Sequence, residues 1–451
     1  MGPHIAAGDL NGDGRTDLVV GGTSGSPPRI LIATESEQFP SGTVPELAEP
    51  AGVAMGPLLL FDADTDGRLD LLVTRTGADT QMGAGAYQPR LFLNRGGFQS
   101  APLGTLPELS VSVGAVSAVD FDHDGDLDVF IGARVKPGEY PLGPTSALWR
   151  NEGGVFVAVD TPLADTGMIT AAVTTDLDGD GWDDLVIATE WGPVRYWHNE
   201  SGRGYQERPL GDATSGWWSS LAVGDFNGDG RLDVAAGNLG LNTTYQASPT
   251  APAVLLHSNC TRRRANPTLI EAYFEEGKLY PRRELQDLSR QIRSLSRNYR
   301  RTADYAAATL VDIFEEETVA NATRMDATEF RSGLFLSQGD GSHHFQPFIR
   351  LAQIAPITAM VTGDFDGDGQ LDLALGQNDH SPIELVGYFD GGIGQILRGD
   401  GGGGFSPVSP RESGFIVPGS ARSIVGLDVD GDRDSVLVTR NNAPALLFKH
   451  K

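Results

Sequence analysis

The chain has 451 residues, more than one ordinary hydrophobic core holds, and its 58 glycines and 27 prolines suit many short strands and turns. Its 34 basic and 60 acidic residues give a formal net charge of −26 at pH 7. Such a surface repels phosphates, so we expect no nucleic-acid partner. No run of eighteen apolar residues occurs, which predicts no membrane span. The single cysteine, Cys260, excludes an internal disulfide framework.

The ends of the sequence carry little besides repeats. The amino-terminal stretch MGPHIAAGDL lacks a basic region followed by an apolar one, so no signal peptide is visible. It leads almost directly into the first predicted strand, and the final stretch ALLFKHK reads as a third strand. We therefore expect a monomer or a segment of a longer chain.

An acidic pattern, D-x-[DN]-x-D-G-x-x-D, recurs along the whole chain. Its six intact copies begin at Asp9, Asp62, Asp120, Asp176, Asp225 and Asp364. Consecutive copies are 49 to 58 residues apart, except that 139 residues separate the last two. That gap predicts an insertion of roughly 80 residues over the ordinary period. A further copy from Asp428 has Arg433 in place of the glycine and Val436 in the ninth place, so we treat it as decayed.

Each repeat has the same internal order. An apolar run such as SSLAVGDF precedes the acidic loop, and a β-branched run such as DLVVGG follows it. A third strand, a glycine turn and an aromatic residue come next, as in RLFLNRGGF. Four strands per repeat predict an all-β protein, a β-propeller of seven or eight four-stranded blades with a helical insertion.

The acidic loops have the donors that calcium prefers. Side chains at positions 1, 3 and 5, a main-chain carbonyl at position 7, an acid at position 9 and a glycine at position 6 would wrap one ion. An EF-hand would need its last acid at position 12 and flanking helices. We therefore predict about six calcium ions, with these ligands in chain order: Asp9, Asn11, Asp13, Arg15, Asp17, Asp62, Asp64, Asp66, Arg68, Asp70, Asp120, Asp122, Asp124, Asp126, Asp128, Asp176, Asp178, Asp180, Trp182, Asp184, Asp225, Asn227, Asp229, Arg231, Asp233, Asp364, Asp366, Asp368, Gln370 and Asp372.

Two alternatives accompany this prediction. Aspartate, asparagine and glycine also form Asx-turns that cap hairpins without any metal. Six copies that all keep the ninth acid favour metal binding for the set, although a single loop could remain without an ion. Magnesium is the second choice of ion, because it loses its water reluctantly and rarely takes all-protein cages.

The insertion differs from the repeats in its periodicity. Between Pro281 and Asn321 apolar residues recur every three or four positions, which predicts a helix from Pro281 and a second one near Asp304 to Phe314. We divide the chain into 1–259, the first propeller part, 260–330, a degenerate hairpin with the helical insertion, and 331–451, the last propeller part. The first helix is rich in arginine, and we expect it to dock on the acidic propeller rather than bind nucleic acid or an anionic membrane.

The residues resemble a known family. The repeat is similar to the FG-GAP or VCBS repeat, and several longer phrases resemble the ASPIC/UnbV-type repeat proteins of bacteria. These phrases are TEWGPVRYW from Thr189, GWWSSLAVGDFNGDGRLDVAAGNLGLNT from Gly216, LIEAYFEEGKLYPRREL from Leu269, YAAATLVDIF from Tyr305 and ESGFIVPGSAR from Glu412. The resemblance implies an integrin-like propeller with calcium in its loops, in a secreted or surface-attached protein, and no established catalytic activity. Where relatives often have another acidic loop, this chain has CTRRRANPT from Cys260, which predicts a metal-free hairpin.

The predicted function follows from these features. We expect a non-enzymatic, calcium-binding module at the cell surface or outside the cell that binds protein or glycan. A nucleophile elbow, a Ser-His-Asp order, a zinc spacing and a phosphate loop are absent from the sequence. The alternative is a propeller-type polysaccharide lyase or glycosidase, because the fold alone does not separate binding from catalysis.

Overall fold

The computed structural model describes residues 2–23, 26–34, 39–42, 47, 54–77, 83–211, 214–258, 268–381, 387–427 and 435–449. In these residues the chain is all-β, with eight antiparallel sheets, most of them four-stranded. This confirms the predicted class. Apolar and β-branched residues form the strands, and glycine and aspartate fill the connections, so local propensity and structure agree.

The first half of the chain forms four sheets whose strands neighbour each other in chain order. They comprise β1 (Ile5–Gly8), β2 (Asp17–Val20), β3 (Arg29–Leu31) and β4 (Ser41–Gly42); β5 (Ala54–Phe61), β6 (Asp70–Thr76), β7 (Arg90–Asn94) and β8 (Phe98–Ser100); β9 (Ser112–Val119), β10 (Asp128–Val135), β11 (Ala147–Asn151) and β12 (Phe156–Val159); and β13 (Met168–Thr175), β14 (Asp184–Gly192), β15 (Arg195–Asn199) and β16 (Tyr205–Arg208). A short strand, β17 (Gly216–Trp217), also pairs with β14.

The second half forms three more sheets of the same kind. They comprise β18 (Ser220–Gly224), β19 (Asp233–Gly237), β24 (Gly333–Ser337) and β25 (His343–Pro347); β26 (Ile357–Gly363), β27 (Asp372–Gln377), β28 (Gln395–Gly399) and β29 (Phe405–Val408); and β30 (Ala421–Leu427), β31 (Ser435–Arg440) and β32 (Ala443–Phe448). The long insertion separates β19 from β24, which are nevertheless paired neighbours in one sheet. The chain therefore leaves a sheet after its second strand and returns to complete it.

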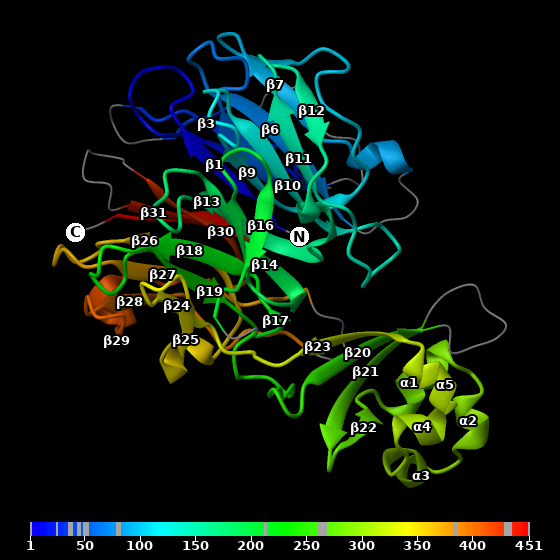
Figure 1. Ribbon diagram of the computed structural model, residues 1–451. Helices are drawn as coiled ribbons and strands as arrows, with labels where there is room; N and C mark the ends of the chain where they lie inside the picture. Colours follow the sequence, from blue (N-terminus) through cyan, green and yellow to red (C-terminus); the bar gives the residue numbers. More distant parts are fainter. Residues whose placement is uncertain are drawn as a thin grey trace.

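Seven sheets contact one another in a cycle through their first strands (Figure 1). β1 contacts β5, and the contacts continue through β9, β13, β18 and β26 to β30, which contacts β1. Between the first and last sheets, Ile5 and Leu18 share an apolar cluster with Leu427 and Leu437. The Thr439 hydroxyl donates a hydrogen bond of 2.7 Å to the Pro3 carbonyl. The two ends of the chain thus lie in neighbouring sheets.

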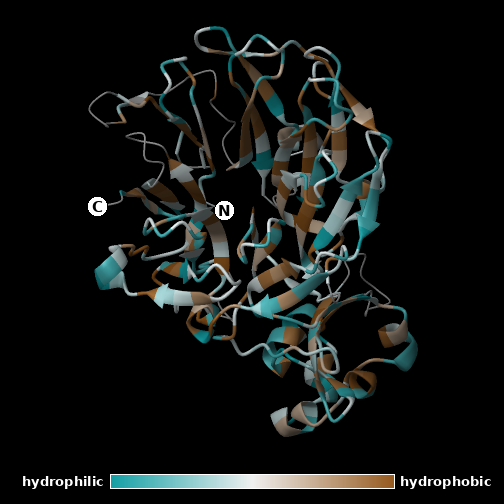
Figure 2. Cartoon of the chain, turned by 60° about the vertical axis from the view of Figure 1, so that its left-hand side comes forward, coloured by the Kyte–Doolittle hydropathy of each residue, from teal (hydrophilic) through white to brown (hydrophobic). Residues whose placement is uncertain are grey.

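Apolar side chains fill the space between adjacent sheets. Phe130 from one sheet packs with Ile169 and Leu185 from the next, and all three are completely buried. The first strands also approach closely at the backbone: a Cβ atom on Gly114 would lie 1.9 Å from the Ile169 carbonyl oxygen, so only glycine fits there. Brown, apolar segments are frequent in the strands in Figure 2, whereas some strands and many connecting loops are teal or white. The hydrophobic core is accordingly divided into layers between sheets.

The insertion forms a small unit of its own (Figure 1). Its sheet has the order β22-β21-β20-β23, with β20 (Ala253–Ser258), β21 (Thr268–Glu275), β22 (Lys278–Pro281) and β23 (Thr323–Ala327). Its five helices are α1 (Leu285–Gln291), α2 (Leu295–Asn298), α3 (Thr302–Ala306), α4 (Leu310–Ile313) and α5 (Glu316–Ala320). A last short helix, α6 (Pro410–Ser413), follows β29. The strands of the unit begin at Ala253, seven residues before the boundary predicted at residue 260. Cys260 itself lies outside the described residues.

The single helix predicted from Pro281 is wrong, because the structure has two short helices, α1 and α2, in its place. The chain leaves the helical conformation at Ile292 (φ −123°, ψ 87°) and at Tyr299 (φ −113°, ψ 96°), which end α1 and α2. Leu288, Ile292 and Leu295 pack on the small sheet rather than on the seven-sheet cycle, and this packing outweighs the small gain from continuing a helix. The helices therefore pack on the small sheet, which differs from the docking on the propeller that the sequence predicts. None of the described helices is long and apolar enough to cross a membrane.

Candidate metal centres

Each of the six acidic loops joins the first and second strands of one sheet. In the repeat from Asp225, β18 ends at Gly224 and β19 begins at the ninth loop residue, Asp233. Gly230, at the sixth position, has φ +82°, a conformation that side chains with a Cβ resist. The decayed seventh copy from Asp428 falls largely outside the described residues. The loops therefore sit at one end of six of the seven sheets.

The first aspartate closes the loop in five copies. In the repeat from Asp225, Oδ1 accepts hydrogen bonds from the amides of Gly228 (2.8 Å) and Asp229 (3.2 Å), and Oδ2 accepts one from Gly230 (2.9 Å). The hydrogen bonds from the fifth and sixth loop residues recur in the copies that begin at Asp9, Asp62, Asp176 and Asp364. These are the Asx-turn contacts that fold the loop, and they leave lone pairs on the carboxylate for a further partner.

The ninth aspartate anchors each hairpin. In all six copies Oδ2 accepts a hydrogen bond of 2.9 to 3.1 Å from the second loop residue. Oδ1 accepts one of 2.7 to 2.9 Å from an amide at the end of the third strand. The side chains are at most 1% exposed, and they belong to Asp17, Asp70, Asp128, Asp184, Asp233 and Asp372. This position thus ties the loop to the third strand of its own sheet.

Burial makes these anchoring carboxylates hard to ionise. Burial raises the pKa of all six above the usual value, and the nearby loop carboxylates raise it further. The effect is largest at Asp128, where burial, with smaller contributions from Asp122 and Asp124, raises the pKa to about 6. A cation among the carboxylates would reverse this shift, because opposite charge favours the ionised form.

The structure brings many of the predicted ligands within reach of one ion. Donor atoms lie within 4.8 Å of one another in four sets: Asp62, Asp64 and Asp66; Asp120, Asp122 and Asp124; Asp176, Asp178 and Asp180; and Asp364, Asp366 and Asp372. In the two remaining copies the third residue is an asparagine, and the Asn11 and Asn227 amides donate to Asp13 (3.3 Å) and Asp229 (3.1 Å). All six loops therefore gather oxygen atoms. In four loops these atoms come from three carboxylates, and in the other two an asparagine replaces one carboxylate.

The seventh position differs from the other predicted ligands. Its amide donates to the carboxylate at position 5 at 2.8 to 3.0 Å in every copy, at Arg15, Arg68, Asp126, Trp182, Arg231 and Gln370. This contact orients the fifth residue. The part that we assigned to the main-chain carbonyl at position 7 stays a prediction.

The loop that begins at Asp120 lacks the closing hydrogen bonds described for the others. Asp120 Oδ1 and Asp122 Oδ1 are buried and accept no hydrogen bond. Asp64 Oδ1 in the preceding repeat is also buried and also lacks a hydrogen-bond donor. A buried acceptor without a partner costs about 1–3 kcal/mol. Calcium binds oxygen atoms alone and accepts six to eight of them, so it would satisfy these atoms. The residues present thus fit a calcium ion.

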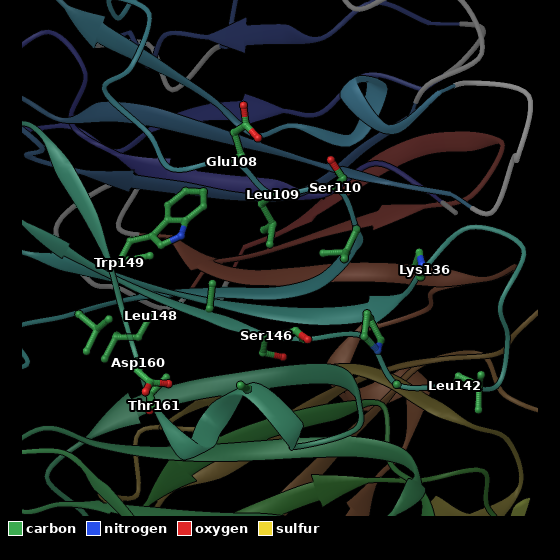
Figure 3. A pocket seen from close by; sticks show the side chains of 18 of the residues that line it. Glu108, Leu109, Ser110, Lys136, Leu142, Ser146, Leu148, Trp149, Asp160 and Thr161 are labelled. Atoms are coloured by element: carbon green, nitrogen blue, oxygen red, sulfur yellow. The ribbon is translucent and has the colours of Figure 1, made fainter.

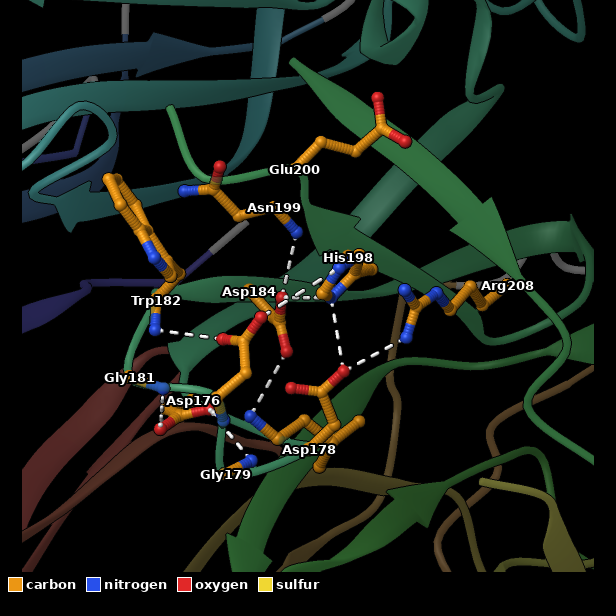
Figure 4. A network of polar contacts seen from close by, with 12 residues as sticks. Asp176, Asp178, Gly179, Gly181, Trp182, Asp184, His198, Asn199, Glu200 and Arg208 are labelled. Atoms are coloured by element: carbon orange, nitrogen blue, oxygen red, sulfur yellow. Dashed lines mark hydrogen bonds and ion pairs between the residues drawn. The ribbon is translucent and has the colours of Figure 1, made fainter. Parts of the chain in front are cut away.

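Cationic side chains approach several loops from the third strand, its turn or the fourth strand. Arg95 pairs with Asp64 and Asp66, and Arg398 pairs with Asp366. In the fourth loop, Arg208 lies 2.9 Å from Asp178 Oδ2 and His198 Nδ1 lies 3.1 Å from the same atom (Figure 4). The sequence analysis missed these residues, because they are distant in sequence from the acids that they contact.

A recurring asparagine also escaped the sequence analysis. Asn94, Asn151 and Asn199 end their third strands and are at most 4% exposed. The side-chain amide of each donates to a main-chain carbonyl in the acidic loop of the preceding sheet, at 2.9 to 3.0 Å. The signal was present as the asparagine before each glycine turn, in LFLNRGG, LWRNEGG and YWHNESG. These residues couple the loop of one sheet to the strand of the next.

A separate pocket lies beside the third sheet (Figure 3). It has a volume of about 570 Å³ and is lined by residues before β9, after β10 and around β11 and β12. Charged Glu108, Lys136 and Asp160 share its walls with Leu109 and Leu142. This size falls within the range of small-ligand sites. The mixed lining suits a polar ligand with an apolar face.

Comparisons with known proteins agree with the repeat. Residues 9–73, 62–131 and 176–236 match the family model of the FG-GAP-like repeat. Each match contains two of the acidic loops, and the closer likeness to ASPIC/UnbV-type proteins stays a prediction. No curated protein sequence matches the chain.

Solved structures show only distant likeness. The V. cholerae biofilm matrix protein Bap1 aligns over 100% of this chain and 87% of its own, with 11% identity and a TM-score of 0.41. The structure of BBS1N in complex with ARL6DN, soaked with lead, aligns over 83% and 89%, with 11% identity and a TM-score of 0.33. Neither likeness is close enough to carry an inference. What the matches establish is that this chain is built, over these ranges, from FG-GAP-like repeats.

Proposed function

We propose that the chain is a closed, seven-bladed propeller whose six acidic loops hold calcium, and that it works outside the cell as a non-enzymatic binding or adhesion module for protein or glycan. The cyclic contacts among seven first strands support the ring, since β30 packs against β1. The eighth sheet belongs to the small unit, which argues against an eighth blade.

The unpartnered carboxylate oxygens carry the metal part of this proposal. Asp64 in the second loop, and Asp120 and Asp122 in the third, each keep a buried carboxylate oxygen without a hydrogen-bond donor. A calcium ion supplies the missing partner and offsets repulsion among the loop carboxylates. Calcium sites of extracellular modules bind at about 10⁻⁴ to 10⁻³ M, which suits a location where the ion is abundant.

A polar cluster of Tyr140, Glu190 and Arg134 bears on the alternative of a lyase. The Tyr140 hydroxyl donates to Glu190 Oε1 at 3.0 Å, and Arg134 pairs with the same carboxylate. A lyase would need a basic group of this kind to accept a proton at neutral pH. Desolvation, and then the charge of Glu190, raises the pKa of the partly exposed Tyr140 above its usual value, which does not favour Tyr140 as that group.

Metal analysis tests the calcium assignment. After dialysis in calcium buffer, we expect about six equivalents in the full chain. The double variant D120N/D122N should lose one equivalent, whereas D340N, which alters an exposed aspartate in the turn before β25, should lose none. An unchanged calcium count in D120N/D122N would contradict the assignment.

Incubation with glycans tests the binding role. A glycan array probed with the calcium-loaded chain should show bound sugars, and incubation with the same sugars in solution should leave them intact. Shortened or unsaturated products would support the lyase or glycosidase instead. Loss of glycan binding after metal removal would show that ligand binding depends on the calcium ions.

A further inference from the structure

The fourth acidic loop differs from the others in having a histidine against its carboxylates. His198 precedes Asn199 at the end of β15 and is 7% exposed. In the other five sheets with an acidic loop, the residues that precede the amide bonded to the ninth aspartate are Ile32, Leu93, Arg150, Leu336 and Arg398. In the described part of the chain, His198 is the one histidine that groups with loop carboxylates as candidate metal ligands.

The donor atoms of this group converge from three segments (Figure 4). His198 Nδ1 lies 3.1 Å from Asp178 Oδ2 and 3.3 Å from Asp184 Oδ1. One ligand atom from each of the three residues lies within 4.8 Å of the other two. A tetrahedral zinc ion holds nitrogen and oxygen ligands at about 2.0–2.2 Å, which places neighbouring donors roughly 3.4 Å apart. The two distances from His198 Nδ1 are therefore close to the spacing of ligands around a small four-coordinate ion.

Neighbouring groups hold these donors in place. Asp184 accepts hydrogen bonds from the Tyr196 hydroxyl (2.9 Å), the Asn199 amide (2.8 Å) and the Leu177 amide (3.1 Å). Arg208 donates to Asp178 Oδ2 at 2.9 Å. Outer partners of this kind fix ligand orientation in metal sites. The two oxygens nearest His198, Asp178 Oδ2 and Asp184 Oδ1, each accept one of these hydrogen bonds and so keep a lone pair for an ion.

We infer that this loop is a mixed nitrogen and oxygen site that selects a zinc-class divalent ion, with His198, Asp178 and Asp184 as protein ligands and water completing the coordination. Calcium takes oxygen ligands, whereas imidazole suits zinc, copper, iron and nickel. The inference rests on the proposed function in one respect, that the acidic loops hold cations. It adds that the six loops are chemically unequal.

Metal competition tests the site in the untagged full chain. The protein is stripped of metal and dialysed against about 1 mM calcium with zinc equimolar to protein. Wild type should retain about one equivalent of zinc. H198L, which installs the leucine found at positions 93 and 336, should bind zinc at least about 100-fold more weakly, beyond what loss of an outer partner costs. H344L, which alters an exposed histidine in β25, should retain the zinc.

A second measurement uses wild type alone, so it does not depend on whether H198L folds. Cobalt(II) added to the calcium-loaded chain should give the intense visible absorption of a four-coordinate ion with a nitrogen ligand, and zinc should displace it. Equal zinc retention by wild type and H198L, or a cobalt spectrum typical of an all-oxygen octahedral ion, would overturn the inference. Six calcium equivalents without zinc would leave the proposed function standing, whereas zinc without calcium would leave only this inference standing.

Discussion

Burial of the ninth loop aspartate gives the metal-free protein a stability that falls as pH rises. Asp128 is completely buried, and burial raises its pKa from 3.8 to about 6. A carboxyl group with a higher pKa in the folded than in the unfolded chain binds its proton more tightly when folded. Its contribution to stability is therefore complete below pH 3.8 and is lost as pH rises through about 6.

The size of this loss follows from the shift. About two pKa units at about 1.4 kcal/mol each correspond to roughly 3 kcal/mol lost from the free energy of unfolding between about pH 4 and pH 7. The pKa of each of the other five ninth aspartates is raised in the same direction, so they add to the loss. This is a large part of a typical stability of 5–15 kcal/mol.

Urea unfolding of the metal-stripped chain, followed by circular dichroism from about pH 4 to about pH 8, measures this dependence. We expect stability to fall with rising pH, and calcium at neutral pH to restore it because the ion neutralises the carboxylates. D128N should make the fall with pH less steep, because five ninth aspartates remain, whereas D304N, at an exposed residue of α3, should leave the slope unchanged. A metal-free wild type that is as stable at pH 7 as at pH 5 would refute the reasoning.

Three further perturbations test other parts of the structure. N151A removes three buried side-chain hydrogen bonds, so urea unfolding should show a loss of about 3 kcal/mol, while N321A at an exposed site should show almost none. R95M frees the carboxylates that Arg95 contacts, so calorimetry should show tighter calcium binding at the second loop; weaker binding would count against competition. L288A opens a cavity in the small unit, so the free energy of unfolding of that unit, measured by thermal unfolding, should fall by about 2–5 kcal/mol, with no change in bound calcium.

The acidic loops and their flanking strands could be predicted because their signals are local. In the repeat from Asp225 the alternation of charge, glycine and apolar residues fixes a turn between two strands, and the structure has β18 end and β19 begin at its borders. The third strand and its glycine turn follow from the same kind of signal. The helices show the limit of this reasoning. The spacing of Leu288, Ile292 and Leu295 identified the buried face correctly but not the breaks, because packing on a small sheet decides where a helix ends.

The sequence by itself determined the repeat, its strands and the acidic residues that gather in each loop, since each depends on neighbours a few positions apart. Tertiary structure decided what surrounds those oxygens. His198 and Arg95 reach the acids only after a third strand pairs with the second, and Arg208 only after the fourth strand pairs with the third. Asn151 reaches the loop of another sheet only after two sheets pack together. Contacts of this kind join residues far apart in the chain, and no local spacing encodes them. They nevertheless set the charge and burial of each site, and therefore which ion it can hold.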